Sequence, residues 1–128
     1  MATKSMAYDN AAYEAVLPVA LGTITGASGN SQRFAAFTTM LIKSVTLKTV
    51  TAGTSASQVL NLFTLSGTTT TTTALTTYGS AVNTFTNVTT TLTMSQGDAC
   101  WISKGTDATD VFACGLEMVI LPGANVTA

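Results

Sequence analysis

Apolar and β-branched residues alternate with polar ones along most of the chain, at the two-residue period of β-strands. In residues 58–65 both faces of the expected strand are apolar, because Val59 and Phe63 interleave with Leu60 and Leu62. Clusters of glycine, serine, asparagine and aspartate separate the alternating segments as turns. The expected strands are residues 16–24, 38–50, 58–65, 87–94, 99–103 and 111–121, and the threonine-rich residues 68–77 are expected to form a solvent-facing strand or a loop edge.

The spacing of these segments and the lack of a convincing core helix predict an all-β fold. We expect an antiparallel β-sandwich of jelly-roll type. The pattern in residues 38–50 also places Phe37, Leu41, Val45 and Leu47 on one face. Residues 1–33 differ in character from the rest, and we expect them to form an N-terminal arm and the first strand, with residues 34–128 as the sandwich domain.

Composition limits the functions that the chain can perform. Of its 128 residues 27 are threonine, 46% are apolar and only 9% are charged, which suits one domain with a modest core. A net charge of −1 excludes the basic surface typical of a nucleic-acid binder. Histidine, the commonest general base and metal ligand, is absent from the sequence. We therefore expect a protein that is not an enzyme and needs no cofactor.

Targeting signals are also weak in this sequence. The longest apolar run, residues 15–21, is interrupted by Pro18 and is far shorter than the roughly 20 residues of a membrane-spanning helix. Asp9 and Glu14 lie where a signal peptide would carry positive charge. We expect a protein that contacts no membrane and is made and kept in the cytoplasm, or assembled there into a larger structure.

The charged residues are unevenly distributed along the chain. Residues 49–97 form a stretch of 49 residues without a single charge. Strand edges normally carry lysine, proline or bulges, because an unpaired edge invites pairing with other chains. The uncharged middle therefore favours either hydration by threonine hydroxyls or permanent burial by neighbouring copies in a closed assembly.

Several side chains are candidates for chemistry or cross-linking. Cys100 and Cys114 lie symmetrically about Asp107, so a hairpin of the last two strands would bring them face to face for a disulfide, whereas in a strict jelly roll they would be two buried free thiols. Asp98, Asp107 and Asp110 could hold Ca²⁺, but their neighbours favour ordinary turn chemistry. Trp101, the only tryptophan, is expected in the core rather than as an interface anchor.

Four short motifs carry a resemblance to a known family. They are TVTAGTSA at residues 49–56, SQGD at residues 95–98, KGTDATDV at residues 104–111 and PGANVTA at residues 122–128. In this order the chain resembles structural proteins of tailed-bacteriophage virions, of the capsid decoration (cement) type. The motifs are turns between apolar strands and include no catalytic signature.

The resemblance implies a jelly-roll-like module, often a homotrimer, on the exterior of the capsid. Such a protein would bind the major capsid protein and tie adjacent subunits together by burying surface across them. Two alternatives remain open. One is a tail, fibre or head-fibre component of the virion, and the other is a carbohydrate- or surface-binding module, which would need an aromatic platform on one sheet.

For contacts with the capsid or with other subunits, we expect the arm to be used. Tyr8, Tyr13, Glu14 and Arg33 combine aromatic area with charge, and tyrosine and arginine are favoured at interfaces. A disordered tail is the alternative for this segment.

Overall fold

The computed structural model describes residues 15–54, 58–78 and 85–121. These ranges do not include Tyr8, Tyr13 and Glu14, so the contacts expected of these three residues lie outside the described residues. The described strands are β1 (Ala15–Ile24), β2 (Phe34–Ala35), β3 (Met40–Thr51), β4 (Gln58–Ser66), β5 (Thr69–Tyr78), β6 (Phe85–Met94), β7 (Ala99–Ser103) and β8 (Val111–Ile120).

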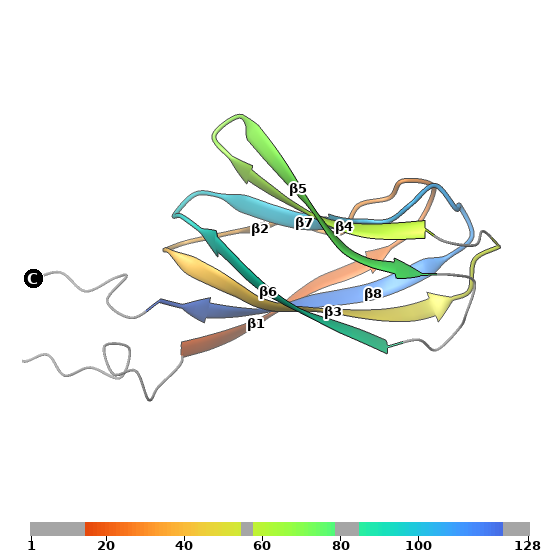
Figure 1. The fold of residues 1–128 in the computed structure, drawn as a ribbon, viewed down its shortest axis with the longest axis horizontal. Helices are drawn as coiled ribbons and strands as arrows, with labels where there is room; N and C mark the ends of the chain where they lie inside the picture. The colour runs from red at the N-terminus through yellow and green to blue at the C-terminus, as the bar shows by residue number, and fades with distance from the viewer. Residues whose placement is uncertain (1–14, 55–57, 79–84, 122–128) are drawn as a thin grey trace, which may run out of the picture.

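The strands form two antiparallel sheets that pack face to face as a sandwich (Figure 1). The strand order is β1-β8-β3-β6 in the first sheet and β2-β7-β4-β5 in the second. Thus β1 pairs with β8, β2 with β7, β3 with β6 and β4 with β5, as in one long hairpin folded over on itself. This is the topology of a jelly roll, and the fold class expected from the sequence is confirmed.

The core lies between the sheets and is built from the inward half of each alternating pattern. In β8, Phe112, Leu116 and Met118 are buried and alternate with more exposed residues. In β6, Leu92 and Met94 face the core, because Leu92 pairs with Ile42 and Met94 with Met40, both of which are core residues. Among the described residues, the other large, fully buried apolar side chains are Leu21, Ile24, Leu60, Leu62, Ile102 and Val45.

A bulge in β3 changes one of the predicted faces. The pairing register of β3 shifts between Ile42 and Ser44 against both of its neighbours. An inserted residue reverses the facing of every later side chain. Leu41 therefore points outward while Val45 and Leu47 point into the core, and Phe37 lies before the strand with 52% of its surface exposed. The prediction that these four side chains share one face is wrong.

The first strand belongs to the sandwich and not to a separate arm. β1 pairs with β8 along its length, so the strand expected within residues 1–33 lies in the first sheet of the sandwich from Ala15 onward. The threonine-rich segment forms β5, which confirms the strand interpretation over the loop edge. In the described part of the chain, no helix is long and apolar enough to cross a membrane.

The connections collect at the two ends of the sandwich. The β1–β2, β3–β4 and β7–β8 connections lie at one end, and the β4–β5 and β6–β7 turns lie at the other (Figure 1). The β4–β5 turn contains Gly67 at φ 61°, in the left-handed region that glycine adopts without strain. The tip of this hairpin stands clear of the other turns.

Candidate functional site

Arg33, the one expected contact residue that the structure describes, lies at the start of β2 against an aromatic ring. Its guanidinium carbon is 4.1 Å from the ring centroid of Trp101, a cation–π distance. Trp101 in turn stacks on Phe63, with ring centroids 5.5 Å apart and planes within 10° of each other. The two rings come from directly paired residues of β7 and β4. We call this group, Arg33, Trp101 and Phe63, the aromatic stack.

The aromatic stack lies on the outer face of the second sheet. Cys100 and Ile102, the neighbours of Trp101 in β7, point into the core, so Trp101 points away from it. Only 8% of Trp101 is nevertheless exposed, because its neighbours cover it. The prediction of a core tryptophan is therefore correct for burial and wrong for the side of the sheet on which it lies.

Replacing Arg33 with alanine is expected to uncover Trp101. The cation–π contact contributes about 0.5–1 kcal/mol at an exposed site, so the fold should remain stable. Because Trp101 is the sole tryptophan, its fluorescence emission should move to longer wavelength as water reaches the ring. Lys48→Ala, on the first sheet, is the matched control and should leave the emission unchanged. Identical spectra for Arg33→Ala and wild type would contradict the contact.

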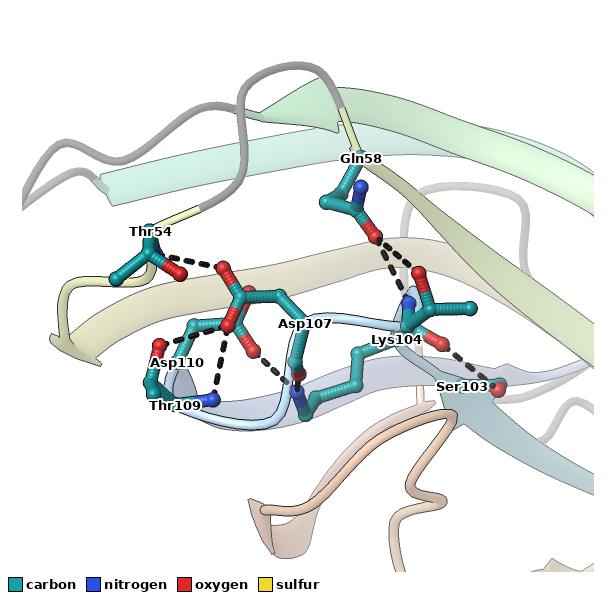
Figure 2. Close-up of polar contacts among 8 residues, drawn as sticks. Thr54, Gln58, Ser103, Lys104, Asp107, Thr109 and Asp110 are labelled. Carbon is teal, nitrogen blue, oxygen red and sulfur yellow. Dashed lines mark hydrogen bonds and ion pairs between the residues drawn. The ribbon is translucent and has the colours of Figure 1, made fainter.

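A buried polar cluster lies in the β7–β8 connection (Figure 2). Lys104 follows β7 and Asp110 precedes β8, and their side chains form an ion pair with 0% and 1% of their surfaces exposed. The Lys104 Nζ also donates to the backbone carbonyl of Asp107. The second carboxylate oxygen of Asp110, Oδ2, is buried and has no hydrogen-bond partner among the described residues.

Asp107 joins this cluster to the β3–β4 connection. Its Oδ2 accepts from the Thr54 backbone N–H at 2.7 Å, and its Oδ1 accepts from the N–H and the hydroxyl of Thr109 at 2.8 and 2.6 Å. Gly53 leaves room for the cluster, since a Cβ there would overlap Asp107 Oδ2 and lie 3.0 Å from the Cβ of Asp110. The two loops are therefore held together by a part-buried hydrogen bond to the Asp107 carboxylate, beside an exposed hydrogen bond from the Thr106 N–H to Gln58 Oε1.

The three aspartates considered for calcium do not gather at one place. Asp98 closes the β6–β7 turn, where its Oδ2 accepts from the Ser95 N–H at 3.0 Å. Asp107 and Asp110 lie in the β7–β8 connection, with the Lys104 ammonium between them. Among the described residues, no group of three or more histidine, cysteine, aspartate or glutamate side chains could hold a metal ion. The turn interpretation of Asp98 is confirmed.

The two cysteines are free and buried. They do not face each other across a hairpin, because β7 and β8 belong to different sheets: Cys100 pairs with Thr64, and Cys114 pairs with Gly22 and Leu47. Removal from water raises the pKa of Cys100 to about 12 and the pKa of Cys114 to about 11. At Cys114 a hydrogen bond with Ser31 offsets part of this rise in pKa. The prediction from the symmetric spacing about Asp107, that Cys100 and Cys114 face each other across a hairpin, is therefore wrong. The jelly-roll topology places the two strands in different sheets.

The stability of the protein is expected to fall above pH 9 through these two thiols. An unfolded cysteine ionises near pH 9.0, whereas the folded thiols stay protonated to about pH 11 and 12. Above pH 9 the unfolded state thus binds fewer protons than the folded state, and the free energy of unfolding decreases as the pH rises. Urea unfolding at pH 8, 9 and 10 measures this decrease. A Cys100→Ala/Cys114→Ala variant should show a flatter pH dependence, and an equally steep one would contradict the assignment.

Two edge strands without charge form one side of the sandwich. β5 and β6 are the last strands of their sheets, and both lie within the uncharged residues 49–97. β1 contacts β7 on the other side of the sandwich, so β5 and β6 share this side, and Figure 1 shows both in front of their sheets. The exposed side chains here are mainly threonines, among them Thr70, Thr72, Thr89 and Thr93. We call this surface the edge pair.

The outer face of the first sheet has a shallow depression of about 480 Å³. Gly115 forms part of its lining, with Pro18, Ala20 and Thr46 beside it. Glu117 is the one ionisable carboxylate that lines it, and that group pairs with Lys43 at 3.6 Å. The depression is therefore lined mainly by small and apolar residues, with one carboxylate that is held in an ion pair.

No protein-family model and no curated protein matches this sequence. The fold is similar to part of a chain in the structure of infectious bursal disease virus strain Gt, with a TM-score of 0.53, 13% identity and coverage of 88% of this chain and 34% of that one. The likeness is one of fold. The VP2 protein of the same virus in derived T=1 particles has a TM-score of 0.47, 14% identity and coverage of 87% and 32%.

A further similar structure comes from a different functional class. It is the Clostridium thermocellum xylanase 10B CBM22-1–GH10 pair of modules complexed with xylohexaose, with a TM-score of 0.47, 9% identity and coverage of 89% of this chain and 26% of that one. The chain spans about a third of the length of the virus chains that it matches.

One part of the aromatic stack and one part of the buried polar cluster could not be found by reasoning from the sequence. The alternating pattern predicts Phe63 only as one of the apolar residues covering a strand, although its pairing with Trp101 builds the aromatic stack. The same pattern places Lys104 in a loop, yet it is the centre of the buried cluster. The one signal in the sequence is the placement of aspartates three and six residues after this lysine.

Proposed function

We propose that this protein is a structural component of a virus particle that binds the outer capsid surface and cements adjacent major capsid subunits. The observation that carries the proposal is the edge pair: two uncharged edge strands on one side of a jelly roll. The similarity of fold to a chain in a virus structure and the resemblance of the sequence motifs to those of phage virion proteins support the same function.

The mechanism rests on permanent burial of the edge pair. An edge strand presents backbone N–H and C=O groups that an extended segment of a partner can complete as an added strand. Threonine side chains leave such an edge hydrated before assembly and fit a pleated surface after it. If the protein acts as a homotrimer, several weak contacts to neighbouring capsid subunits combine into strong attachment, because each later contact is intramolecular.

The aromatic stack favours cementing over the carbohydrate-binding alternative. A sugar-binding platform needs an open ring face, whereas Trp101 is covered by Arg33 and Phe63. The role as a tail or fibre component shares the fold and differs in copy number.

Quantitative mass spectrometry and cryo-electron microscopy of purified particles test the proposal. A cement protein is expected in a copy number comparable to that of the major capsid protein, at ordered positions on the capsid exterior. A small fixed number of copies at one vertex or on the tail would contradict cementing and support the fibre alternative. Absence of the protein from washed particles would contradict both virion functions.

Deleting residues 1–14 is expected to weaken attachment to the capsid while the sandwich stays folded. The segment contains Tyr8, Tyr13 and Glu14, and the first described strand begins only at Ala15. Co-sedimentation of the truncated protein with particles that lack it measures attachment, and thermal unfolding verifies the fold. A full-length Lys4→Ala variant is the control for a change confined to charge. Undiminished binding of the truncated protein would contradict the role assigned to the arm.

A further inference from the structure

The ion pair of Lys104 and Asp110 leaves buried hydrogen-bonding groups unsatisfied. The ammonium has three N–H bonds, and the described residues offer it two acceptors, Asp110 Oδ1 and the Asp107 carbonyl oxygen. Oδ2 of Asp110 has none to accept from. A buried carboxylate oxygen without a partner is costly, and a native structure normally has a reason for it.

We propose that Lys104 and Asp110 condense into an intramolecular amide bond between Nζ of the lysine and Cγ of the aspartate. The two reacting groups are already in contact and shielded from water (Figure 2). They belong to one short connection whose two ends are fixed by β7 and β8. A bond formed here would close the connection covalently.

The reaction balances without an oxidant, a reductant or a co-reactant. One proton passes from the Lys104 ammonium to the Asp110 carboxylate, which leaves a neutral amine and a neutral acid. The amine nitrogen attacks Cγ and the N–C bond forms; the nitrogen then loses a second proton to the departing hydroxyl, and the C–O bond breaks. One water is released, and the net charge is unchanged because one positive and one negative group disappear together.

Burial favours this product in two ways. Charged groups lose their hydration in the interior, whereas an amide carries no charge to stabilise. The fixed contact also makes the attack intramolecular, which removes the entropic cost of bringing amine and carboxyl together. The amide keeps one N–H, for which the Asp107 carbonyl oxygen remains an acceptor, while two N–H bonds and one carboxylate oxygen leave as the water and the other oxygen becomes a neutral amide carbonyl.

Asp107 is the positioning residue for the reaction. Three donors from Thr54 and Thr109 hold its carboxylate, and this carboxylate and the Cβ of Asp110 approach the same point beside Gly53. The backbone carbonyl of Asp107 accepts from the Lys104 Nζ, so a residue whose carboxylate is held in place also orients the amine toward Asp110.

The mass of the intact protein tests the proposal directly. The wild-type chain, reduced, alkylated and denatured, is expected to have a mass one water below the mass calculated from its sequence with both cysteines alkylated. Lys104→Arg keeps the positive charge and should show the full sequence mass. Asp110→Asn should react with loss of one ammonia in place of water. A wild-type chain at its full sequence mass would overturn the proposal, whatever the variants do.

Cleavage before aspartate residues places the bond. A cut at Asp107 opens the connection between the two partners, so the piece beginning at Asp98 and containing Lys104 should stay joined to the piece containing Asp110. Release of the two pieces at separate masses would overturn the assignment to these residues.

The fraction of newly synthesised chains that carry the bond, followed by mass over time after pulse-labelled cell-free synthesis, tests Asp107. Asp107→Asn should form it at least about tenfold more slowly, and Asp107→Glu should restore part of the rate. Asp98→Asn, in the remote β6–β7 turn, is the matched control and should react as the wild type does. Trp101 fluorescence verifies that each variant is folded. An unchanged rate in folded Asp107→Asn would remove Asp107 from the reaction.

Discussion

Replacing Asp110 with alanine is expected to lower the free energy of unfolding by about 3–5 kcal/mol. The substitution leaves the Lys104 ammonium buried, with the Asp107 carbonyl oxygen as its remaining acceptor. An uncompensated charge away from water is among the largest single destabilising effects in a domain. For a domain of this size the midpoint of thermal unfolding should fall by about 10–20 °C. Urea and thermal unfolding measure both quantities.

Two controls separate the loss of a charge partner from the loss of packing. A Lys104→Met/Asp110→Leu double variant removes both charges and should be clearly more stable than Asp110→Ala, because no unpaired ion remains. Glu117→Gln breaks the exposed pair with Lys43 and should change stability by about 1 kcal/mol or less. If Asp110→Ala unfolded at the wild-type denaturant concentration, the burial of Lys104 against Asp110, as ions or as the amide, would be contradicted.

Placing lysine at both strands of the edge pair is expected to weaken attachment to the capsid. Thr72 of β5 and Thr89 of β6 are exposed, so Thr72→Lys/Thr89→Lys should fold normally. Lysine on an edge strand opposes pairing with another chain, and a buried ammonium without a partner is costly. We expect affinity for particles to fall at least about tenfold, or about 1.4 kcal/mol, as measured by co-sedimentation.

Thr23→Lys is the matched control for the edge substitutions. Thr23 is an exposed threonine of β1, on the side of the sandwich away from β5 and β6. The same change there should leave attachment within about twofold of the wild type. Equal losses for Thr23→Lys and for the edge variant would contradict the assignment of the edge pair and point to a general effect of charge.

The sequence is sufficient to predict most strands and the fold class, because alternation directly reflects one buried face. Prediction fails where that period is absent or interrupted. β2 has only two residues, too few to show a period. The bulge at Lys43 inserts one residue in β3 and reverses the facing of the side chains after it, and no single residue of the sequence indicates it.

The candidate site is less predictable, for a different physical reason. Arg33 can be selected as a contact residue, but its partner ring, Trp101, is set by the pairing of β2 with β7, which connects residues far apart in the chain. Lysine is normally solvated, so the complete burial of Lys104 arises only from the meeting of the β3–β4 and β7–β8 connections.

The pairing of β1 and β3 with β8 has a consequence for synthesis. β8, the last described strand, lies between β1 and β3 and pairs with both. The first sheet therefore cannot be completed until residues 111–120 have left the ribosome. During that interval the uncharged residues 49–97 are already made, and the inner faces of β4, β5 and β6 have little to cover them. Contacts of such long range form slowly. Each new chain therefore passes through a period in which it depends on chaperones or on dilution to avoid aggregation.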